Sequence, residues 1–196
     1  DPIYSNEISR CHNIQMAKKI SLNSAYGAIG NQYFRYFDVK QAEAITLGGQ
    51  LSIRWVERDV NRFMNKLLGT DNKNYVVASD TDSIYLKLDT LVEKVCKGKS
   101  TKQIVDFLNK AAEDKIQKVI DDSYQNLAHY VNAYQQKMIM KREAIANKGI
   151  WVAKKRYMMN VFDEEGIRFD IPKLKIMGVE AVKSSTPEVC RGKIKD

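Results

Sequence analysis

The sequence lacks the residues from which metal clusters and disulfide scaffolds are built. Its 196 residues include 3 cysteines and 2 histidines, and Cys11, Cys96 and Cys190 lie far apart, in no Cys-x-x-Cys spacing. We therefore expect neither a zinc cluster nor a disulfide framework, and a reducing compartment is the default.

Long apolar runs are missing as well. No stretch reaches the ~18–20 apolar residues that a membrane span needs, and no signal peptide opens the sequence, so we expect no membrane partner. The length suits one domain or one and a half, and 44% hydrophobic with 29% charged residues is an ordinary soluble composition. A net charge of +8 and a pI near 9.3 favour a polyanionic partner.

Two long helices are predicted in the first third of the chain. Residues from about 6 to 28 favour helix and contain no proline, and Lys19, Asn23 and Tyr26 recur at i, i+4 and i+7, so they share one face. An ammonium, an amide and a phenol suit contacts with phosphate and a base; a plain solvated face is the alternative. A second helix is expected from about 39 to 68. Residues at steps of three and four form its predicted buried stripe, which is Ala42, Ile45, Gly49, Ile53, Val56, Val60, Phe63 and Leu67.

Residues 75–88 predict a β-hairpin. Two runs of strand-forming residues flank a tight Ser-Asp-Thr-Asp-Ser turn, and alternation places the apolar residues of the second run on one face. Asp80 and Asp82 are two residues apart, so on extended chain their carboxylates point the same way and repel each other. A hard divalent cation relieves that repulsion. The motif alone is weak evidence, because solvated acidic turns and the Asp-x-Asp of glycosyltransferases share it.

The second half of the chain is expected to contain both helix and sheet. An amphipathic helix is predicted from about 101, and strands from about 137 to 145 and 149 to 162, with a turn at 163–166. Residues 137–175 hold ten Lys or Arg against five Asp or Glu, which fits a surface that faces phosphates. A charged, solvated sheet is the alternative.

Several motifs in this chain together resemble the family B replicative DNA polymerases. Lys19-Ile-Ser-Leu-Asn-Ser-Ala-Tyr-Gly27 matches the family's Lys-x-x-x-Asn-Ser-x-Tyr-Gly motif on a fingers helix, and Asp80-Thr-Asp-Ser83 matches the Asp-Thr-Asp-Ser hairpin of the palm. Lys154-Lys-Arg-Tyr157 is similar to a Lys-Lys-x-Tyr-type element that grips the primer–template. Residues 173–180 and 184–187 look like the palm-to-thumb junction of the tailed-phage branch, so the resemblance covers nearly the whole chain.

The resemblance implies a role for each matched residue. Lys19 and Asn23 would face the triphosphate of the incoming nucleotide, and Tyr26 would lie under the nascent base pair. Asp80 and Asp82 would be the catalytic carboxylates and would hold Mg²⁺. The complete enzyme would use two such ions, with Mn²⁺ as a substitute, for in-line attack of the primer 3′-hydroxyl on the α-phosphorus. The residues that would bind the DNA duplex are Lys154, Lys155, Arg156 and Tyr157.

The chain departs from the family pattern in two places. Lys141-Arg-Glu143 stands where the phage branch has Asp-Arg-Glu, so Glu143 is kept as a further candidate metal ligand while an acidic neighbour is lost. The family's other metal-binding aspartate lies in Asp-x-x-Ser-Leu-Tyr-Pro, and no proline in this sequence follows Leu-Tyr. We therefore expect this chain to be one part of a polymerase. The chain itself would lack the exonuclease domain, the rest of the palm and the thumb, and it would be inactive alone.

The expected fold is α+β, in which an antiparallel palm sheet carries the Asp-Thr-Asp hairpin, packs on helices and follows an N-terminal fingers helix. Residues 1–37 are expected to be the C-terminal part of the fingers, 38–183 the palm, and 184–196 the start of the thumb connection. The expected function is DNA synthesis from dNTPs on primer–template DNA in the cytoplasm of an infected host, with the remaining polymerase domains in cis or on a separate chain.

Two other functions stay open. One is a non-catalytic nucleic-acid-binding or assembly piece of a split or degenerate polymerase. The other, a nucleotide-sugar glycosyltransferase, would explain the acidic pair but neither the Asn-Ser-x-Tyr-Gly helix nor the basic sheet.

Overall fold

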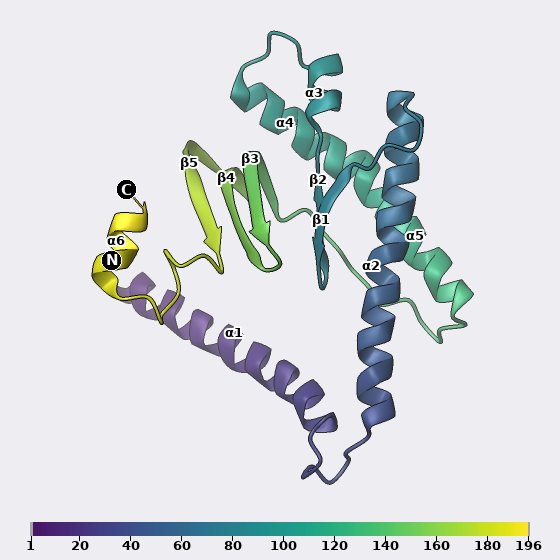
Figure 1. The fold of residues 1–196 in the computed structure, drawn as a ribbon, viewed down its shortest axis with the longest axis vertical. Coiled ribbons are helices and arrows are strands. Elements are labelled where there is room, and N and C mark those ends of the chain that lie inside the picture. Colours follow the sequence, from purple (N-terminus) through teal and green to yellow (C-terminus); the bar gives the residue numbers. More distant parts are fainter. Residues whose placement is uncertain (1, 196) are drawn as a thin grey trace. The chain divides into compact units, whose positions relative to one another are not determined.

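The computed structural model describes residues 2–195 and confirms an α+β fold with antiparallel sheets (Figure 1). The chain divides into two compact units, Asp1–Leu51 and Ser52–Asp196, with the boundary inside helix α2 (Val39–Leu68). The first unit holds helix α1 (Pro2–Ile29) and the start of α2, and the second holds all remaining elements. None of the helices in residues 2–195 combines the length and the apolarity that crossing a membrane requires.

Helix α2 begins and ends at the predicted residues, and only its second half is buried. At its start, Asp38 Oδ1 accepts the backbone N–H groups of Lys40 (2.9 Å) and Gln41 (3.2 Å), two donors that have no partner within the helix. From residue 52 onward every fourth side chain is buried: Ser52, Val56, Val60, Met64 and Leu68. The predicted buried stripe is thus confirmed at Val56 and Val60, and it is wrong at Ile45 and Leu67, whose side chains are exposed.

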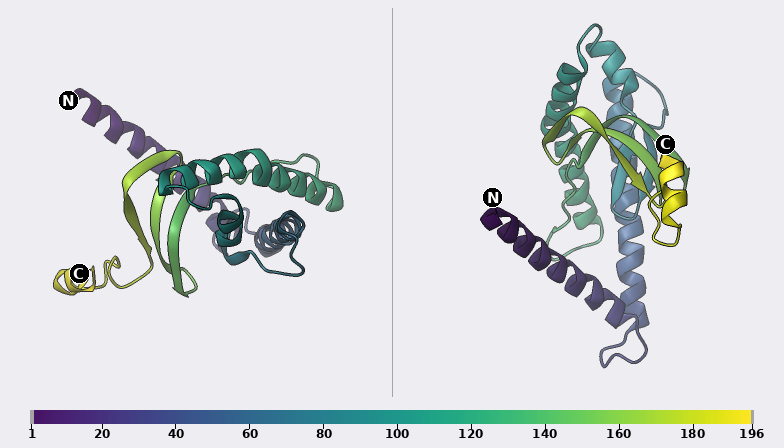
Figure 2. Two further views of the ribbon diagram at one scale, coloured as in Figure 1. Left: turned by 90° about the horizontal axis from the view of Figure 1, so that it is seen from above. Right: turned by 90° about the vertical axis from the view of Figure 1, so that its left-hand side faces the viewer.

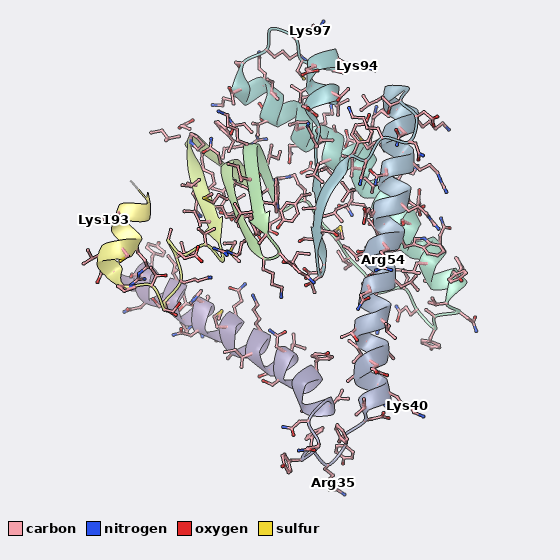
Figure 3. All side chains as sticks on the ribbon, in the orientation of Figure 1. Arg35, Lys40, Arg54, Lys94, Lys97 and Lys193 are labelled. Carbon is pink, nitrogen blue, oxygen red and sulfur yellow. The ribbon has the colours of Figure 1, made fainter. Side chains whose placement is uncertain are left out.

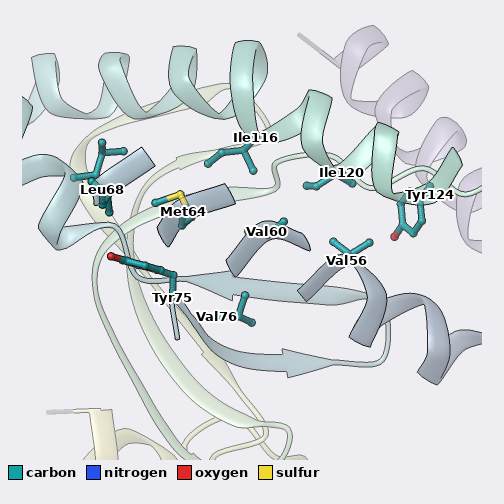
Figure 4. Close-up of a cluster of buried hydrophobic side chains, with 10 residues drawn as sticks. Val56, Val60, Met64, Leu68, Tyr75, Val76, Ile116, Ile120 and Tyr124 are labelled. Carbon is teal, nitrogen blue, oxygen red and sulfur yellow. The ribbon is translucent and has the colours of Figure 1, made fainter. Parts of the chain in front are cut away.

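The core of the second unit lies where α2 meets the hairpin of residues 76–86 and the helical segment of residues 112–130 (Figure 4). Val56, Val60 and Met64 have no exposed surface, and each such side chain contributes roughly 1.5–3 kcal/mol when it is removed from water. The other members of the buried cluster are Leu68, Tyr75, Val76, Leu91, Ile116, Ile120 and Tyr124. The core therefore supports the hairpin from one side.

Residues 89–130 form three α-helices and one π-helical segment. Helix α3 (Asp89–Val95) is short, and α4 (Thr101–Ala111) starts with a capping box between Ser100 and Gln103. The π-helical segment η1 (Ala112–Ile116) then joins α4 to α5 (Gln117–Tyr130). The long amphipathic helix predicted from about 101 is thus confirmed, with a π segment inside it.

The strands form two sheets (Figures 1 and 2). The predicted hairpin is confirmed as β1 (Val76–Asp80) and β2 (Ser83–Leu86), and it forms a sheet of its own. The second sheet has the order β3-β4-β5, with β3 at Ala144–Ala153, β4 at Arg156–Glu164 and β5 at Ile167–Met177. The strand predicted at 149–162 is wrong, because a turn at Lys154 and Lys155 divides it, and residues 137–143 are not strand. Helix α6 (Glu188–Lys195) ends the described chain.

Candidate functional site

Asp80 and Asp82 lie at the tip of the β1–β2 hairpin. Asp80 ends β1 and pairs with Ser83, so Thr81 and Asp82 form a two-residue turn in which Thr81 has a φ of +53°. Three hydrogen bonds converge on Asp80: its carbonyl oxygen accepts the Asp82 N–H (2.6 Å) and the Ser83 hydroxyl (3.1 Å), and its Oδ1 accepts the Thr81 hydroxyl (3.0 Å). Asp82 is therefore part of a turn and not of extended chain, so the expected parallel direction of the two carboxylates does not follow from strand alternation.

Neither carboxylate is in an ion pair with another described residue, although the chain carries a net charge of +8. Asp80 is half-buried and Asp82 is exposed. The pKa of Tyr124 on α5 is raised, mainly by burial and to a smaller extent by the negative charge of Asp82. Two carboxylates without cationic partners at a hydrogen-bonded tip suit a hard divalent cation. Across residues 2–195, however, no group of three or more His, Cys, Asp or Glu side chains is placed to hold a metal.

A cleft of about 200 Å³ brings Asp80 together with the predicted DNA-binding residues. Asp80 shares this cleft with Lys154, Lys155 and Tyr157, although more than seventy positions separate them in the sequence. Asp82 and Arg156 are not among its lining residues, which are Ala78, Ser79, Asp80, Tyr85, Trp151, Ala153, Lys154, Lys155 and Tyr157. One acidic residue and two basic residues thus line the same small cleft.

Three aromatic rings fix the hairpin against the three-stranded sheet at this cleft. The Tyr85 ring lies edge-on to Trp151 (5.1 Å between centroids) and to Tyr157 (5.5 Å). Such pairs contribute about 0.5–1.5 kcal/mol each beyond the area they bury. The Trp151 ring lies over Gly149, where a Cβ would approach it to 2.7 Å. Burial raises the pKa of Tyr157 to about 12, and the Tyr85 phenol adds to the rise, so Tyr157 stays neutral at physiological pH.

Lys154 and Lys155 form the turn between β3 and β4. Both are exposed, Lys155 has a φ of +60°, and neither is in an ion pair with a described residue. Arg156 differs, because its guanidinium pairs with Glu180. Basic side chains also occur far from this turn, for example Lys94 and Lys97 near the end of α3 (Figure 3), so charge alone does not define a binding surface.

Glu143 lies in a different and larger cleft, of about 850 Å³, which it lines together with Lys141. Its Oε1 is 2.5 Å from Lys175 Nζ, which also lies 3.1 Å from Glu164. Burial lowers the pKa of Lys175, but the two carboxylates outweigh it and raise the pKa above the ordinary value. The structure thus gives Glu143 a cationic partner and does not bring it into the Asp80 cleft.

Lys19, Asn23 and Tyr26 lie on α1 in the first unit. All three are exposed, but so is every residue of α1 from 4 to 27, so exposure does not distinguish them from the rest of the helix. They belong to a different compact unit from the hairpin and the basic turn.

Comparison with known proteins supplies the family. The model of DNA polymerase family B matches residues 5–195. The chain is 44% identical over 192 residues to a DNA-directed DNA polymerase of Escherichia phage RB69, a match covering 93% of this chain and 21% of that protein. It is 44% identical over 184 residues to the DNA-directed DNA polymerase of Enterobacteria phage T4, covering 89% of this chain and 20% of the other. The chain spans about a fifth of the length of these relatives, and a family model that matches almost all of it shows that the chain belongs to DNA polymerase family B.

Proposed function

We propose that this chain contributes the nucleotide-binding helix and most of the palm to a DNA-directed DNA polymerase. The observation that carries the proposal is the cleft in which Asp80 meets Lys154, Lys155 and Tyr157. A carboxylate can hold a metal ion at the reacting 3′ end of a primer, and two lysines can bind the phosphates of the primer–template backbone. The two phage relatives named as DNA-directed DNA polymerases support the same reaction.

In this proposal residues 1–37 are the C-terminal part of the fingers, 38–183 the palm, and 184–196 the start of the thumb connection. The polymerase would act in the cytoplasm of an infected host, with its remaining domains in cis or on another chain. Its substrates would be dNTPs and primer–template DNA.

Family B polymerases generally use divalent metal ions, and the hairpin tip fits such an ion because its two carboxylates have no cationic partner in the described chain. Asp82 and Asp80 would hold Mg²⁺, or Mn²⁺ in its place, and Glu143 would join them only after leaving Lys175. The bound ions would supply stabilisation of charge on the attacking and leaving oxygens of an in-line displacement.

The remaining residues would bind and orient the substrates. Lys19 and Asn23 would donate hydrogen bonds to the triphosphate, and Tyr26 would lie against the nascent base pair. Lys154 and Lys155 would neutralise backbone phosphates. Tyr157, which stays protonated because its pKa is about 12, would donate a hydrogen bond without adding negative charge.

A non-catalytic nucleic-acid-binding piece is the second candidate, and one observation favours it. The described residues offer two carboxylates at the hairpin and no third metal ligand beside them. In that case Lys154 and Lys155 would bind DNA while Asp80 and Asp82 contributed no catalysis.

Primer extension in a grafted enzyme distinguishes the two candidates. Residues 5–195 replace the matching segment of the RB69 polymerase, and extension is measured with Mg²⁺ and all four dNTPs. We expect the graft to extend the primer, and Asp82→Asn to lower the rate at least ~100-fold, about 2.7 kcal/mol of transition-state stabilisation. Asp71→Asn, an exposed aspartate outside the site, is the matched control. Full activity of the Asp82→Asn graft, or a graft that binds DNA without extending it, would support the second candidate instead.

A further inference from the structure

Gly178 lies directly against the backbone of the basic turn formed by Lys154 and Lys155. A Cβ on Gly178 would stand 2.0 Å from the Lys155 carbonyl oxygen, 3.1 Å from its carbonyl carbon and 3.3 Å from Arg156 Cγ. The closest of these atoms is backbone, so it cannot rotate away as a side-chain end would. Gly178 also has a φ of +63°, which disfavours any side chain. Only glycine fits this contact.

Arg156, the next residue along, is held by the same segment. Its guanidinium pairs with Glu180, whose Oε1 also lies 3.3 Å from Lys183 Nζ. Arg156 Nε is buried and has no hydrogen-bond partner in the described chain, so the guanidinium is packed at its base. The pKa of the Glu180 carboxyl is lowered, first by a hydrogen bond from its own backbone N–H and second by the Lys183 ammonium. The carboxyl is therefore charged at neutral pH.

We infer that residues 178–183 form a clamp that positions the basic turn, and that Arg156 is the anchor of this clamp and not a ligand of DNA phosphate. Lys154 and Lys155 have no acidic partner in the described chain and line the Asp80 cleft, whereas Arg156 is paired with Glu180 and does not line it. The sequence motif places three basic residues in a row, and the structure divides them between two tasks. This inference rests on the proposal that the basic turn binds DNA.

The clamp itself is tested without DNA, by hydrogen exchange of the amides of residues 154–157 in the whole chain. We expect Gly178→Ala to speed exchange there at least ~10-fold, because the added methyl group displaces the Lys155 carbonyl. Gly166→Ala is the matched control: it has a φ of +89° at the next turn of the sheet, but its Cβ would meet nothing within 4 Å. Glu180→Gln, which leaves the backbone contact intact, should give a smaller acceleration and covers the case in which Gly178→Ala does not fold.

The division of tasks is tested by the salt dependence of duplex DNA binding, since each neutralised phosphate adds about 0.9 to the log–log slope. Lys154→Ala and Lys155→Ala should each reduce the slope by about 0.9, and Arg156→Ala should leave it unchanged. In the Glu180→Gln background Arg156 loses its ion-pair partner and can bind a phosphate, so the slope should rise by up to about 0.9. Adding Arg156→Ala to that background should remove the rise.

Each outcome decides something. A slope that falls by about 0.9 with Arg156→Ala alone would show that Arg156 already binds phosphate and would overturn the division of tasks. Exchange in Gly178→Ala no faster than in Gly166→Ala would overturn the clamp. DNA binding by the unmodified chain that does not depend on salt would contradict the proposed function, while the exchange measurement would still decide whether the clamp exists.

Discussion

The same chemical change, aspartate to asparagine, should have opposite consequences at Asp163 and at Asp82. Asp163 on β4 is completely buried and lies between two arginines. The Arg142 guanidinium donates a hydrogen bond to Asp163 Oδ1. Arg168 Nε lies 2.9 Å from Asp163 Oδ2, which makes an ion pair but not an aligned hydrogen bond. Gly166 N–H also donates to Oδ1 (3.1 Å). Asp82, by contrast, is exposed and has no ion-pair partner in the described chain.

The expected magnitudes follow from these surroundings. Asp163→Asn leaves two guanidinium groups beside a neutral amide, and losing one partner of a buried ion pair costs about 3–5 kcal/mol. At about 2–4 °C per kcal/mol for a chain of this size, Tm should fall by roughly 6–20 °C. Asp82→Asn removes only an exposed charge, so the metal-free protein should change by no more than about 0.5 kcal/mol.

Thermal melts with and without Mg²⁺ measure both effects. At ten times its Kd the ion should stabilise the unmodified protein by about 1.4 kcal/mol, a rise of roughly 3–6 °C in Tm, and Asp82→Asn should abolish that rise. Mn²⁺ serves as a second ion, because two carboxylates alone hold Mg²⁺ weakly. An Asp163→Asn protein that melts within about 2 °C of the unmodified one would refute the buried-pair argument. An Asp82→Asn protein that melts as low as Asp163→Asn would show that Asp82 is part of the scaffold.

Three further predictions concern Tyr157, Gly149 and Lys19. The pKa of Tyr157 is about 12 in the folded protein and about 10 in the unfolded chain, so the unfolded chain loses this proton first as the pH rises. The stability that Tyr157 contributes is present below about pH 10 and should be lost between about pH 10 and 12. In alkaline melts Tyr157→Phe should lose less stability over this range. Gly149→Ala should destabilise the protein by about 1–3 kcal/mol and change its tryptophan fluorescence, since the methyl group displaces Trp151; unchanged fluorescence would contradict the contact. In the grafted polymerase Lys19→Ala should raise the KM for dNTP by ~10–100-fold, and Lys18→Ala, one position away on the helix, should change it far less.

Helix α2 and the hairpin could be predicted because local signals and tertiary packing agree there. Apolar residues every three or four positions require one buried face, and the predicted members Val56 and Val60 do pack in the core. The alternation after Asp82 predicts which side of β2 is buried, and Ile84 and Leu86 do pack against the core. The first half of α2 carries the same period and is not buried, so the period predicts the helix but not where it packs.

The turn at Lys154 and Lys155 could not be predicted from local signals. It contains no Gly, Asn, Asp or Pro, the residues that mark most tight turns. Lys155 adopts a φ of +60°, and Gly178 packs against its backbone from the end of β5. The position of this turn is fixed by a partner more than twenty residues away, so no window of sequence around it contains the information.

The candidate site divides in the same way. The motifs identify Asp80, Lys154 and Tyr157, but only the fold shows that they line one cleft. The pairing of Arg156 with Glu180 and of Glu143 with Lys175 has no signal in the sequence, because a charge run does not reveal which of its members meets an opposite charge.

The π-helical segment η1 gives this chain a place where its length can change at little cost. A π turn takes up one residue more than an α turn, so losing one residue there would convert it to an ordinary turn and leave α4 and α5 in phase. Glu113 and Asp114 are exposed within it and are the natural residues to lose. The same deletion inside α5 would rotate every later side chain by about 100° and carry Tyr124 and Leu127 out of their buried positions. Among relatives of this chain, single-residue insertions and deletions within the helical segment 101–130 should therefore concentrate at η1.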